Sequence, residues 1–224
     1  MHAFFHDRAD AGRQLAARMS HYEKCFQLLV LALPRGGVPV ASAVASRLDA
    51  PMDVLVVRKL GVPCQPELAM GAIAPRGVCV LDEDVVDRLE IGGDVVEMVR
   101  RQEELELERR ERVYREGRPL FDVTGMTVIL VDDGIATGAT CHAAIRYLKQ
   151  QHARSIVVAS PVISVEAFRK LRLLVDDIVT VALPTVLRSV SSWYKEFEQV
   201  TNEEILACLH AMNPVHVASE FARE

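Results

Sequence analysis

Residues 128–140 read Val128-Ile-Leu-Val-Asp-Asp-Gly-Ile-Ala-Thr-Gly-Ala-Thr140, and this stretch decides the fold. Its first four residues are apolar and mostly β-branched, which is typical of a strand buried on both faces of a parallel sheet. Asp132 and Asp133 follow at the carboxyl end of that strand, where open α/β sheets bind ligands. The turn Gly134–Thr140 offers backbone N–H groups, hydroxyls and a helix N-terminus to one anion. The pattern therefore predicts a phosphate site.

A plain strand-to-helix turn is the alternative, with Asp-Gly making the bend and Thr137 or Thr140 capping the helix. Such a turn needs one cap, whereas this stretch holds two carboxylates, two glycines and two threonines, so the phosphate site is favoured. The chain contains no dinucleotide-binding Gly-x-Gly-x-x-Gly and no Gly-x-x-x-x-Gly-Lys-Ser/Thr. A phosphatase with a strand-end aspartate as its nucleophile would need a second aspartate where Gly134 stands.

An arginine and two glycines follow a second predicted strand, Gln27–Leu33, in the turn Pro34-Arg-Gly-Gly-Val38, before a helical pattern over Pro39–Leu48. Arg35 can hold a phosphate through two parallel hydrogen bonds, and Gly36-Gly37 lets backbone N–H groups approach the same anion. A solvated arginine in an ordinary turn is the alternative.

A third predicted strand, Asp53–Val57, brings Arg58 and Lys59 to its end, although basic residues at strand ends are often simply solvated. The segment Leu60–Gly71 follows, and its two prolines and two glycines predict a mobile loop. Glu67 is the only carboxylate in that loop.

These motifs resemble those of the type I phosphoribosyltransferases, whose PRPP-binding motif is four apolar residues, two acidic residues and a Gly/Thr-rich loop. The resemblance runs from about His6 to Leu209 and is closest to a group of predicted bacterial enzymes with no settled substrate. It implies a doubly wound, mainly parallel α/β sheet in a single domain, residues 1–224. Residues 61–119 would form a lid and helical insertion, and residues 184–212 a small hood.

The resemblance also implies a site. Asp132 and Asp133 would hold the ribose hydroxyls and, through water, Mg²⁺, while the following loop wraps the 5′-phosphate and the basic residues face the pyrophosphate. The residues so implied to bind PRPP are Arg35, Gly36, Gly37, Lys59, Asp132, Asp133, Gly134, Ile135, Ala136, Thr137, Gly138, Ala139 and Thr140. Those implied to act in catalysis are Arg35, Lys59, Glu67, Asp132 and Asp133. A non-proline cis peptide is expected at Arg35–Gly36.

The insertion is predicted to hold a hairpin around Val78–Leu81 and a long helix over Asp94–Arg115. Glutamates precede arginines by four residues in that helix, as in Glu97/Arg101 and Glu106/Arg110, which stabilises a helix. Its apolar stripe is thin, so a solvated surface helix is favoured over one that reaches a partner subunit.

The second half continues the pattern, with helices over Ala143–Gln151 and Val165–Leu174 and strands over Ser155–Ala159 and Ile178–Ala182. Trp193, Tyr194 and Phe197 are candidates to stack on a flat ring, with Pro161 and Val162 just past a strand end in the same acceptor pocket. Spacings of three and four residues are also what a helix packing on the core would show, and the two interpretations stay open.

The function implied is transfer of the 5-phosphoribosyl group of PRPP to a nitrogenous heterocycle, with release of pyrophosphate and with Mg²⁺ as cofactor. Relatives that act on 6-oxopurines commonly have an aspartate at the position of Ala136, so hypoxanthine and guanine are disfavoured here. The alternative is a PRPP-binding regulatory protein with little or no transferase activity.

Composition sets further limits. The 224 residues are 50% hydrophobic and carry a net charge of −5, which gives no footprint for broad nucleic-acid binding. No apolar run is long enough for a membrane span, and Met1–Asp10 does not resemble a signal peptide, so we expect a cytoplasmic protein. The five cysteines form no Cys-x-x-Cys pair, and Cys141 is either a thiol activated near a helix N-terminus or, as we favour, a buried small residue. We also expect a homodimer.

Overall fold

A five-stranded parallel sheet forms the centre of the computed structural model, which describes residues 4–63 and 65–212 and, of Glu67, only the backbone. The strands lie in the order β2-β1-β6-β7-β8. Their bounds are β1 Leu28–Ala32, β2 Met52–Val54, β6 Thr127–Val131, β7 Ser155–Val162 and β8 Asp177–Ala182. Because all four strand pairs are parallel, the carboxyl ends of the strands meet at one edge.

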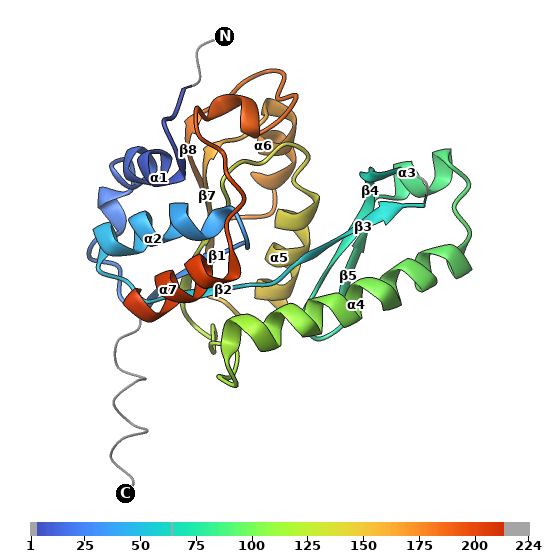
Figure 1. Cartoon of the computed structure of the whole chain (residues 1–224), viewed down its shortest axis with the longest axis horizontal. Coiled ribbons are helices and arrows are strands. Elements are labelled where there is room, and N and C mark those ends of the chain that lie inside the picture. Colours follow the sequence, from blue (N-terminus) through green and yellow to red (C-terminus); the bar gives the residue numbers. More distant parts are fainter. Residues whose placement is uncertain (1–3, 64, 213–224) are drawn as a thin grey trace, which may run out of the picture.

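Helices cover both faces of this sheet (Figure 1). Side chains alternate along β1, so that Val30 packs in one core cluster while Leu29 and Leu31 pack in another. The first cluster takes in α1 (Arg8–Ala16), α2 (Gly37–Leu48) and α7 (Asn202–Met212), and the second takes in α5 (Ala139–Gln150) and α6 (Val165–Leu171). The doubly wound α/β class is confirmed.

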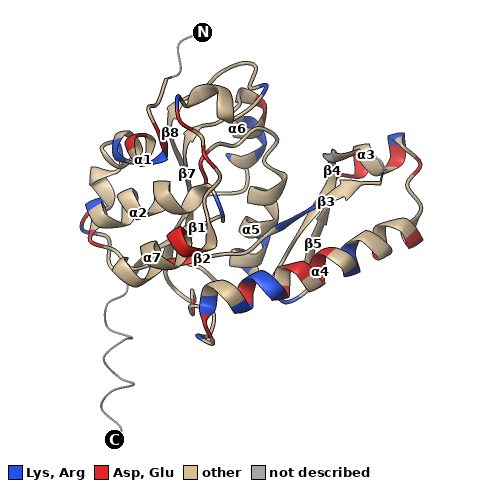
Figure 2. Ribbon diagram, in the orientation of Figure 1, with Lys and Arg blue, Asp and Glu red and all other residues tan. Residues whose placement is uncertain are grey.

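The segment between β2 and β6 forms an arm that extends away from this core (Figure 1). It contains a three-stranded antiparallel sheet, β3 (Arg58–Val62), β4 (Gln65–Ala74) and β5 (Val78–Leu81), followed by α3 (Glu83–Arg88) and the long helix α4 (Gly93–Arg115). Acidic and basic residues are interspersed along α4 (Figure 2). The predicted long helix and the hairpin at β5 are both confirmed.

Two predictions in this region are wrong. The segment Leu60–Gly71 is not a loop, because β3 and β4 pair across it; Gly61 lies at register shifts in the ladder, where a bulge accommodates it. The strand predicted over Asp53–Val57 ends at Val54, so that Arg58 and Lys59 open β3 instead of ending a core strand.

A buried ion pair fixes the arm to the core. Arg115, at the end of α4, donates from Nη1 to Asp53 of β2 over 2.8 Å and from Nη2 to the carbonyl oxygen of Val54 over 2.8 Å. The side chains of Arg115 and Asp53 are 8% and 7% exposed. Isolated buried charges are costly, so this pairing is needed for the arm to pack here.

Several predicted element bounds change. α5 starts at Ala139, four residues earlier than expected, because Gly138 adopts a left-handed conformation (φ 82°) directly before it. β7 extends to Val162, so Pro161 and Val162 lie within a strand and not just past its end, as predicted. The remaining short elements are the 3₁₀ turns η1 (Ser20–Tyr22) and η2 (Ser191–Trp193). Over residues 4–63 and 65–212, no helix is both long enough and apolar enough to cross a membrane.

Candidate functional site

The acidic pair lies at the carboxyl edge of the sheet, directly after β6. Asp133 donates its backbone N–H to Oδ1 of Asp132 over 2.9 Å, which fixes the first carboxylate. Burial, and then the negative charge of Asp133, raise the pKa of Asp132. Burial also raises the pKa of Asp133, although a hydrogen bond from Arg8 acts in the opposite direction. A nearby cation or hydrogen-bond donor would therefore stabilise the ionised form of each acid.

The Pro-Arg-Gly-Gly turn packs directly against this pair. A Cβ on Gly36 would lie 2.5 Å from Cγ of Asp133, and a Cβ on Gly37 would lie 2.7 Å from the carbonyl oxygen of Val131. Both glycines are thus required by close approach, since a side chain at either position would overlap the strand end that carries the acids. The two motifs, about a hundred residues apart in sequence, form one site.

The predicted cis peptide lies one bond earlier than expected, at Pro34–Arg35. Gly36 already has helical backbone angles, φ −61° and ψ −31°, and directly precedes α2. Arg35 donates from Nη1 to the carbonyl oxygen of Val200 over 3.3 Å, so its guanidinium faces the C-terminal segment.

The predicted phosphate loop connects β6 to α5. Its Ile135 is buried and donates its backbone N–H to the carbonyl oxygen of Val162 over 2.9 Å. Ser164 donates its hydroxyl to the carbonyl oxygen of Ala136 over 2.6 Å, which ties the loop to the start of α6. The first N–H groups of a helix have no partner within the helix, so Ala139 and Thr140 present donors at the end of this loop.

Cys141 follows in the first turn of α5. It is buried, and burial raises the pKa of its thiol, so the favoured interpretation of a small packing residue is confirmed.

The two basic residues of β3, Arg58 and Lys59, have different surroundings. Arg58 forms an ion pair with Glu103 of α4, with Nη2 to Oε2 at 2.6 Å, and this contact closes the arm on itself. Lys59 is exposed and lines a cleft of about 680 Å³ between the arm and the phosphate loop. Glu67 belongs to β4, and its side chain lies outside the described part of the structure.

That cleft reaches the phosphate loop at Thr137, Gly138 and Ala139. Its other walls are the arm, at β4, β5 and α3, and the helix α6. The volume is that of a small-molecule site. Asp132 and Asp133 are not among its lining residues, so the cleft adjoins the phosphate end of the predicted site and not its acidic centre.

Sequence reasoning missed Arg8, the first residue of α1. Its Nε donates to Oδ2 of Asp133 over 2.8 Å, and the two side chains are 12% and 14% exposed. Its Nη1 donates to the carbonyl oxygen of Glu198 over 2.6 Å, and its Cζ lies 3.8 Å from the ring centroid of Phe197. A lone arginine 125 residues before its partner gives no local sequence signal.

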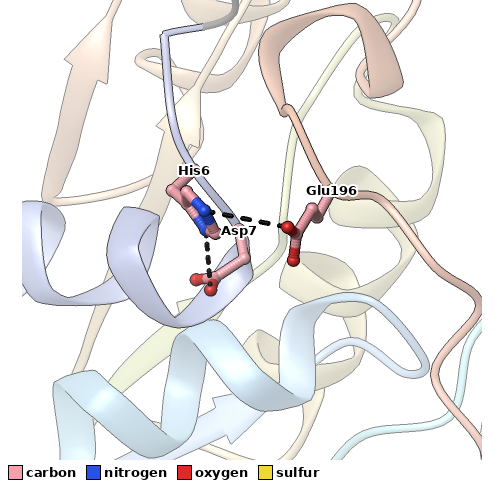
Figure 3. A group of neighbouring side chains, drawn as sticks. All are labelled: His6, Asp7 and Glu196. Carbon is pink, nitrogen blue, oxygen red and sulfur yellow. Dashed lines mark hydrogen bonds and ion pairs between the residues drawn. The ribbon is translucent and has the colours of Figure 1, made fainter.

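Residues 194–200, here called the strap, run past the N-terminal segment. Backbone N–H groups of Lys195 and Glu196 donate to the carbonyl oxygens of Phe5 (3.0 Å) and His6 (2.9 Å). The His6 ring lies between carboxylates, with Nδ1 3.3 Å from Asp7 and Nε2 3.7 Å from Glu196 (Figure 3). These three side chains could hold a metal ion, but each is at least 40% exposed, and we interpret them as a surface cluster in which His6 links the N-terminal segment to the strap.

The predicted acceptor residues do not line an open pocket together. Tyr194 is buried, packs on Phe5, and donates its hydroxyl to the carbonyl oxygen of Asp133 over 2.5 Å. Val162 is fully buried in the same cluster, and Pro161 is buried in β7. Trp193 is partly exposed beside Phe4, with ring centroids 5.8 Å apart. In this structure Tyr194 therefore packs on the protein, although it does so from a segment that is not a regular helix.

Comparison with known proteins bears directly on this geometry. A family model for the phosphoribosyl transferase domain matches residues 5–170, which contain the acidic pair, the phosphate loop and the Pro-Arg-Gly-Gly turn. The chain belongs to the type I phosphoribosyltransferase family. Family membership accounts for the meeting of these three segments at one sheet edge.

Among relatives in this family, a Mycobacterium tuberculosis protein named "Putative phosphoribosyl transferase" is 44% identical over 205 residues. The match covers 92% of this chain but only 46% of that protein, so the chain spans about half the length of the curated relative. TT1426 from Thermus thermophilus, a crystal structure, is 37% identical with a TM-score of 0.77, covering 93% of this chain and 98% of that one. The AQ2163 protein from Aquifex aeolicus, 10% identical with a TM-score of 0.52 over 81% of this chain and 77% of that one, shares the fold.

Proposed function

We propose that this chain transfers the 5-phosphoribosyl group of PRPP to a ring nitrogen of a heterocycle and releases pyrophosphate. One observation carries the proposal: Gly36 and Gly37 pack directly on the strand end that carries Asp132 and Asp133. That contact brings the Pro-Arg-Gly-Gly turn, the two carboxylates and the loop 134–140 together at the carboxyl edge of the sheet, which supports their use as the anion-binding turn, the diol-binding acids and the phosphate loop of one site. PRPP has a pyrophosphate, a diol and a 5′-phosphate in the matching order.

Each end of the donor has protein groups of suitable chemistry. Asp132 and Asp133 would accept hydrogen bonds from the ribose hydroxyls, and the loop 134–140 would surround the 5′-phosphate with backbone N–H and threonine hydroxyl groups. Arg35, Lys59 and the N–H groups of Gly36 and Gly37 would face the pyrophosphate. Arg35 bonds to the carbonyl oxygen of Val200 in this structure, so it would exchange that carbonyl for a phosphate oxygen.

The donor set also fits Mg²⁺. Oxygen ligands are what this ion prefers, and it keeps several waters, so a water-mediated contact with Asp132 and Asp133 needs no closed protein cage. Burial and mutual repulsion raise the pKa of Asp132, and a nearby cation would relieve both effects. When bound, Mg²⁺ would offset the negative charge of the leaving pyrophosphate.

In the proposed reaction a bond would form between the acceptor nitrogen and C1′ while the bond from C1′ to the pyrophosphate oxygen breaks, and the proton of the acceptor N–H would pass to the released pyrophosphate or to water. The protein would act by position and electrostatics, with the carboxylates near the ribosyl cation and the cations near the leaving group. Glu67 of β4 remains a candidate to orient the acceptor. The acceptor side would include Trp193, whereas the buried residues Pro161, Val162 and Tyr194 would contribute only if the strap moved. Ala136 leaves the loop without an acid, which argues against hypoxanthine and guanine.

The experiment is Mg²⁺-dependent pyrophosphate release from PRPP across a panel of purines, pyrimidines and related heterocycles, together with calorimetry of PRPP binding. Asp132→Asn with Asp133→Asn should abolish PRPP binding and leave the circular dichroism spectrum unchanged. The matched control is Asp87→Asn with Asp94→Asn, two exposed acids of the arm. Unaltered PRPP affinity in the site variant would refute the assignment, and tight binding without turnover on any acceptor would show a PRPP-binding regulator.

A further inference from the structure

Arg8 is a partly buried cation beside the acidic pair, and no motif assigned it a role. It opens α1, whose start is fixed by Asp7, since Oδ1 of Asp7 accepts from the backbone N–H of Asp10 over 2.7 Å. That cap holds the first turn of α1 in place, and Arg8 reaches from it to Asp133.

The contact with Asp133 leaves the carboxylate able to bind a ligand. Arg8 engages Oδ2, the oxygen that also packs against Gly36. An ionised carboxylate has two oxygens with about four acceptor positions, so Oδ1 can still accept from a ligand hydroxyl. A charge-assisted hydrogen bond of this kind fixes the rotamer of the acid more firmly than a neutral one would. Arg8 thus orients Asp133 without filling its second oxygen.

The same guanidinium holds the strap. Its Nη1 bonds to the carbonyl oxygen of Glu198 while its face lies on the ring of Phe197. Tyr194, also in the strap, bonds to the carbonyl oxygen of Asp133. Strap residues therefore contact Asp133 in two ways, at its backbone carbonyl through Tyr194 and at its carboxylate through Arg8. The strap ends at Val200, whose carbonyl oxygen accepts a hydrogen bond from Arg35, so the strap also contacts the Pro-Arg-Gly-Gly turn.

We propose that Arg8 is a positioning residue of the donor site, which aligns Asp133 for the ribose diol and couples occupation of that site to the seating of the strap. The proposal rests on the proposed function, because it takes a ribose phosphate as the ligand. Arg8 acts on the diol end of the donor directly, through Asp133, and reaches the pyrophosphate end only indirectly, through the strap and Arg35, so its larger effect is expected at the diol end.

The fluorescence of Trp193 can report how the strap is seated. Trp193 is the only tryptophan in the sequence and directly precedes the strap. Its carbonyl oxygen accepts from the N–H groups of Phe4 (3.0 Å) and Phe5 (2.9 Å), and its ring lies beside that of Phe4. A change in how the strap is seated against the N-terminal segment will alter the surroundings of this ring and its emission.

The test compares wild type, Arg8→Gln, Arg8→Lys and the control Arg13→Gln, an exposed arginine of the same helix. Each protein is titrated with PRPP, ribose 5-phosphate and inorganic pyrophosphate, all with Mg²⁺, by calorimetry and by Trp193 fluorescence. Arg8→Gln should lose about tenfold or more in affinity for the two ribose ligands, as expected for one charge-assisted hydrogen bond. It should also lose the fluorescence response and lose much less affinity for pyrophosphate than for the ribose ligands. The affinity of Arg8→Lys for the ribose ligands should lie between those of the wild type and Arg8→Gln. An ammonium group keeps the charge but cannot hold Asp133 and Glu198 in the same forked geometry.

The outcomes separate the two proposals. If the wild type binds neither PRPP nor ribose 5-phosphate, the proposed function fails and this inference fails with it. If the wild type binds and Arg8→Gln matches it in affinity and fluorescence, only the role of Arg8 is refuted. An equal loss for ribose ligands and pyrophosphate would show a merely structural residue and would also refute it. Should Arg8→Gln not fold by circular dichroism, Arg8→Lys decides, and wild-type behaviour in that variant overturns the proposal.

Discussion

Gly36→Ala is the sharpest perturbation that the structure offers, because it tests the contact on which the site depends. The backbone at Gly36 has helical angles (φ −61°, ψ −31°), so alanine fits its conformation without strain. The only obstacle is space, since the new Cβ would lie 2.5 Å from Cγ of Asp133 and closer still to Oδ2. Asp133 must therefore move, or the turn must.

The cost follows from what holds Asp133. If the carboxylate rotates away, it loses the 2.8 Å bond from Arg8, and hydrogen bonds to charged groups contribute about 1.5–3 kcal/mol. If the carboxylate stays, the site is overpacked, which typically costs about 1–3 kcal/mol. Either route predicts a loss of about 1–3 kcal/mol in the free energy of unfolding, together with a loss of PRPP affinity of about tenfold or more.

Urea unfolding followed by circular dichroism measures the first quantity and calorimetry with PRPP and Mg²⁺ the second. The matched control is Gly93→Ala at the start of α4, where an added Cβ meets nothing within 4 Å. Alanine favours helices over glycine by up to about 1 kcal/mol, so this control should be neutral or slightly stabilising. A Gly36→Ala protein with wild-type stability and wild-type affinity would show that the turn and the acids do not pack as described.

Two further predictions concern charge. Asp53→Asn leaves Arg115 buried without its ionic partner, so the free energy of unfolding measured in urea should fall by about 3–5 kcal/mol. The control Asp122→Asn, at an exposed position, should change that free energy little. Equal effects of the two variants would contradict the buried pair. In α4, a hydrogen bond from Arg100 is the main cause that lowers the pKa of Glu97 from 4.5 to about 2. A carboxylate whose pKa is lower in the folded state stabilises it above pH 4.5 and loses that effect as the pH falls towards 2. Because solvent reaches this pair, its contribution to the free energy of unfolding should be small and weakened by salt. Between about pH 5 and pH 3, Glu97→Gln should lose less stability than the wild type. Identical pH profiles of stability for the two proteins would refute the prediction.

Local patterns were enough to predict the core of the fold. Buried strands before a Gly-rich turn and a helix have a short-range signature, because β-branched apolar runs, glycines and helix caps act on neighbouring residues. This is why the sheet strands around Asp132 and Arg35 and the long helix α4 were predicted close to their observed bounds. The acidic pair and the Pro-Arg-Gly-Gly turn could be assigned to one site because parallel strands end at one edge.

Prolines and glycines misled the prediction where pairing partners decide the structure. The segment Leu60–Gly71 has loop-like composition, yet it is paired strand, because β4 offers a ladder on both sides and Gly61 lies at a bulge. Strand pairing is a long-range interaction, and composition within one segment does not show what lies beside it. The hood was uncertain for the same reason: spacing allowed Tyr194 to face a ligand or the core, and only the tertiary structure shows that Tyr194 packs on Phe5.

The expectations of a homodimer and a cytoplasmic location stay predictions. Sequence alone determined the fold class and predicted that two carboxylates and a Gly/Thr-rich turn share one strand end, since these signals act between neighbouring residues. Tertiary structure decided how that chemistry is assembled. Only folding brings Arg8 to Asp133 across 125 positions, and only folding lets Gly36 contact the same carboxylate, because ion pairs and close approaches depend on the meeting of elements that are distant along the chain.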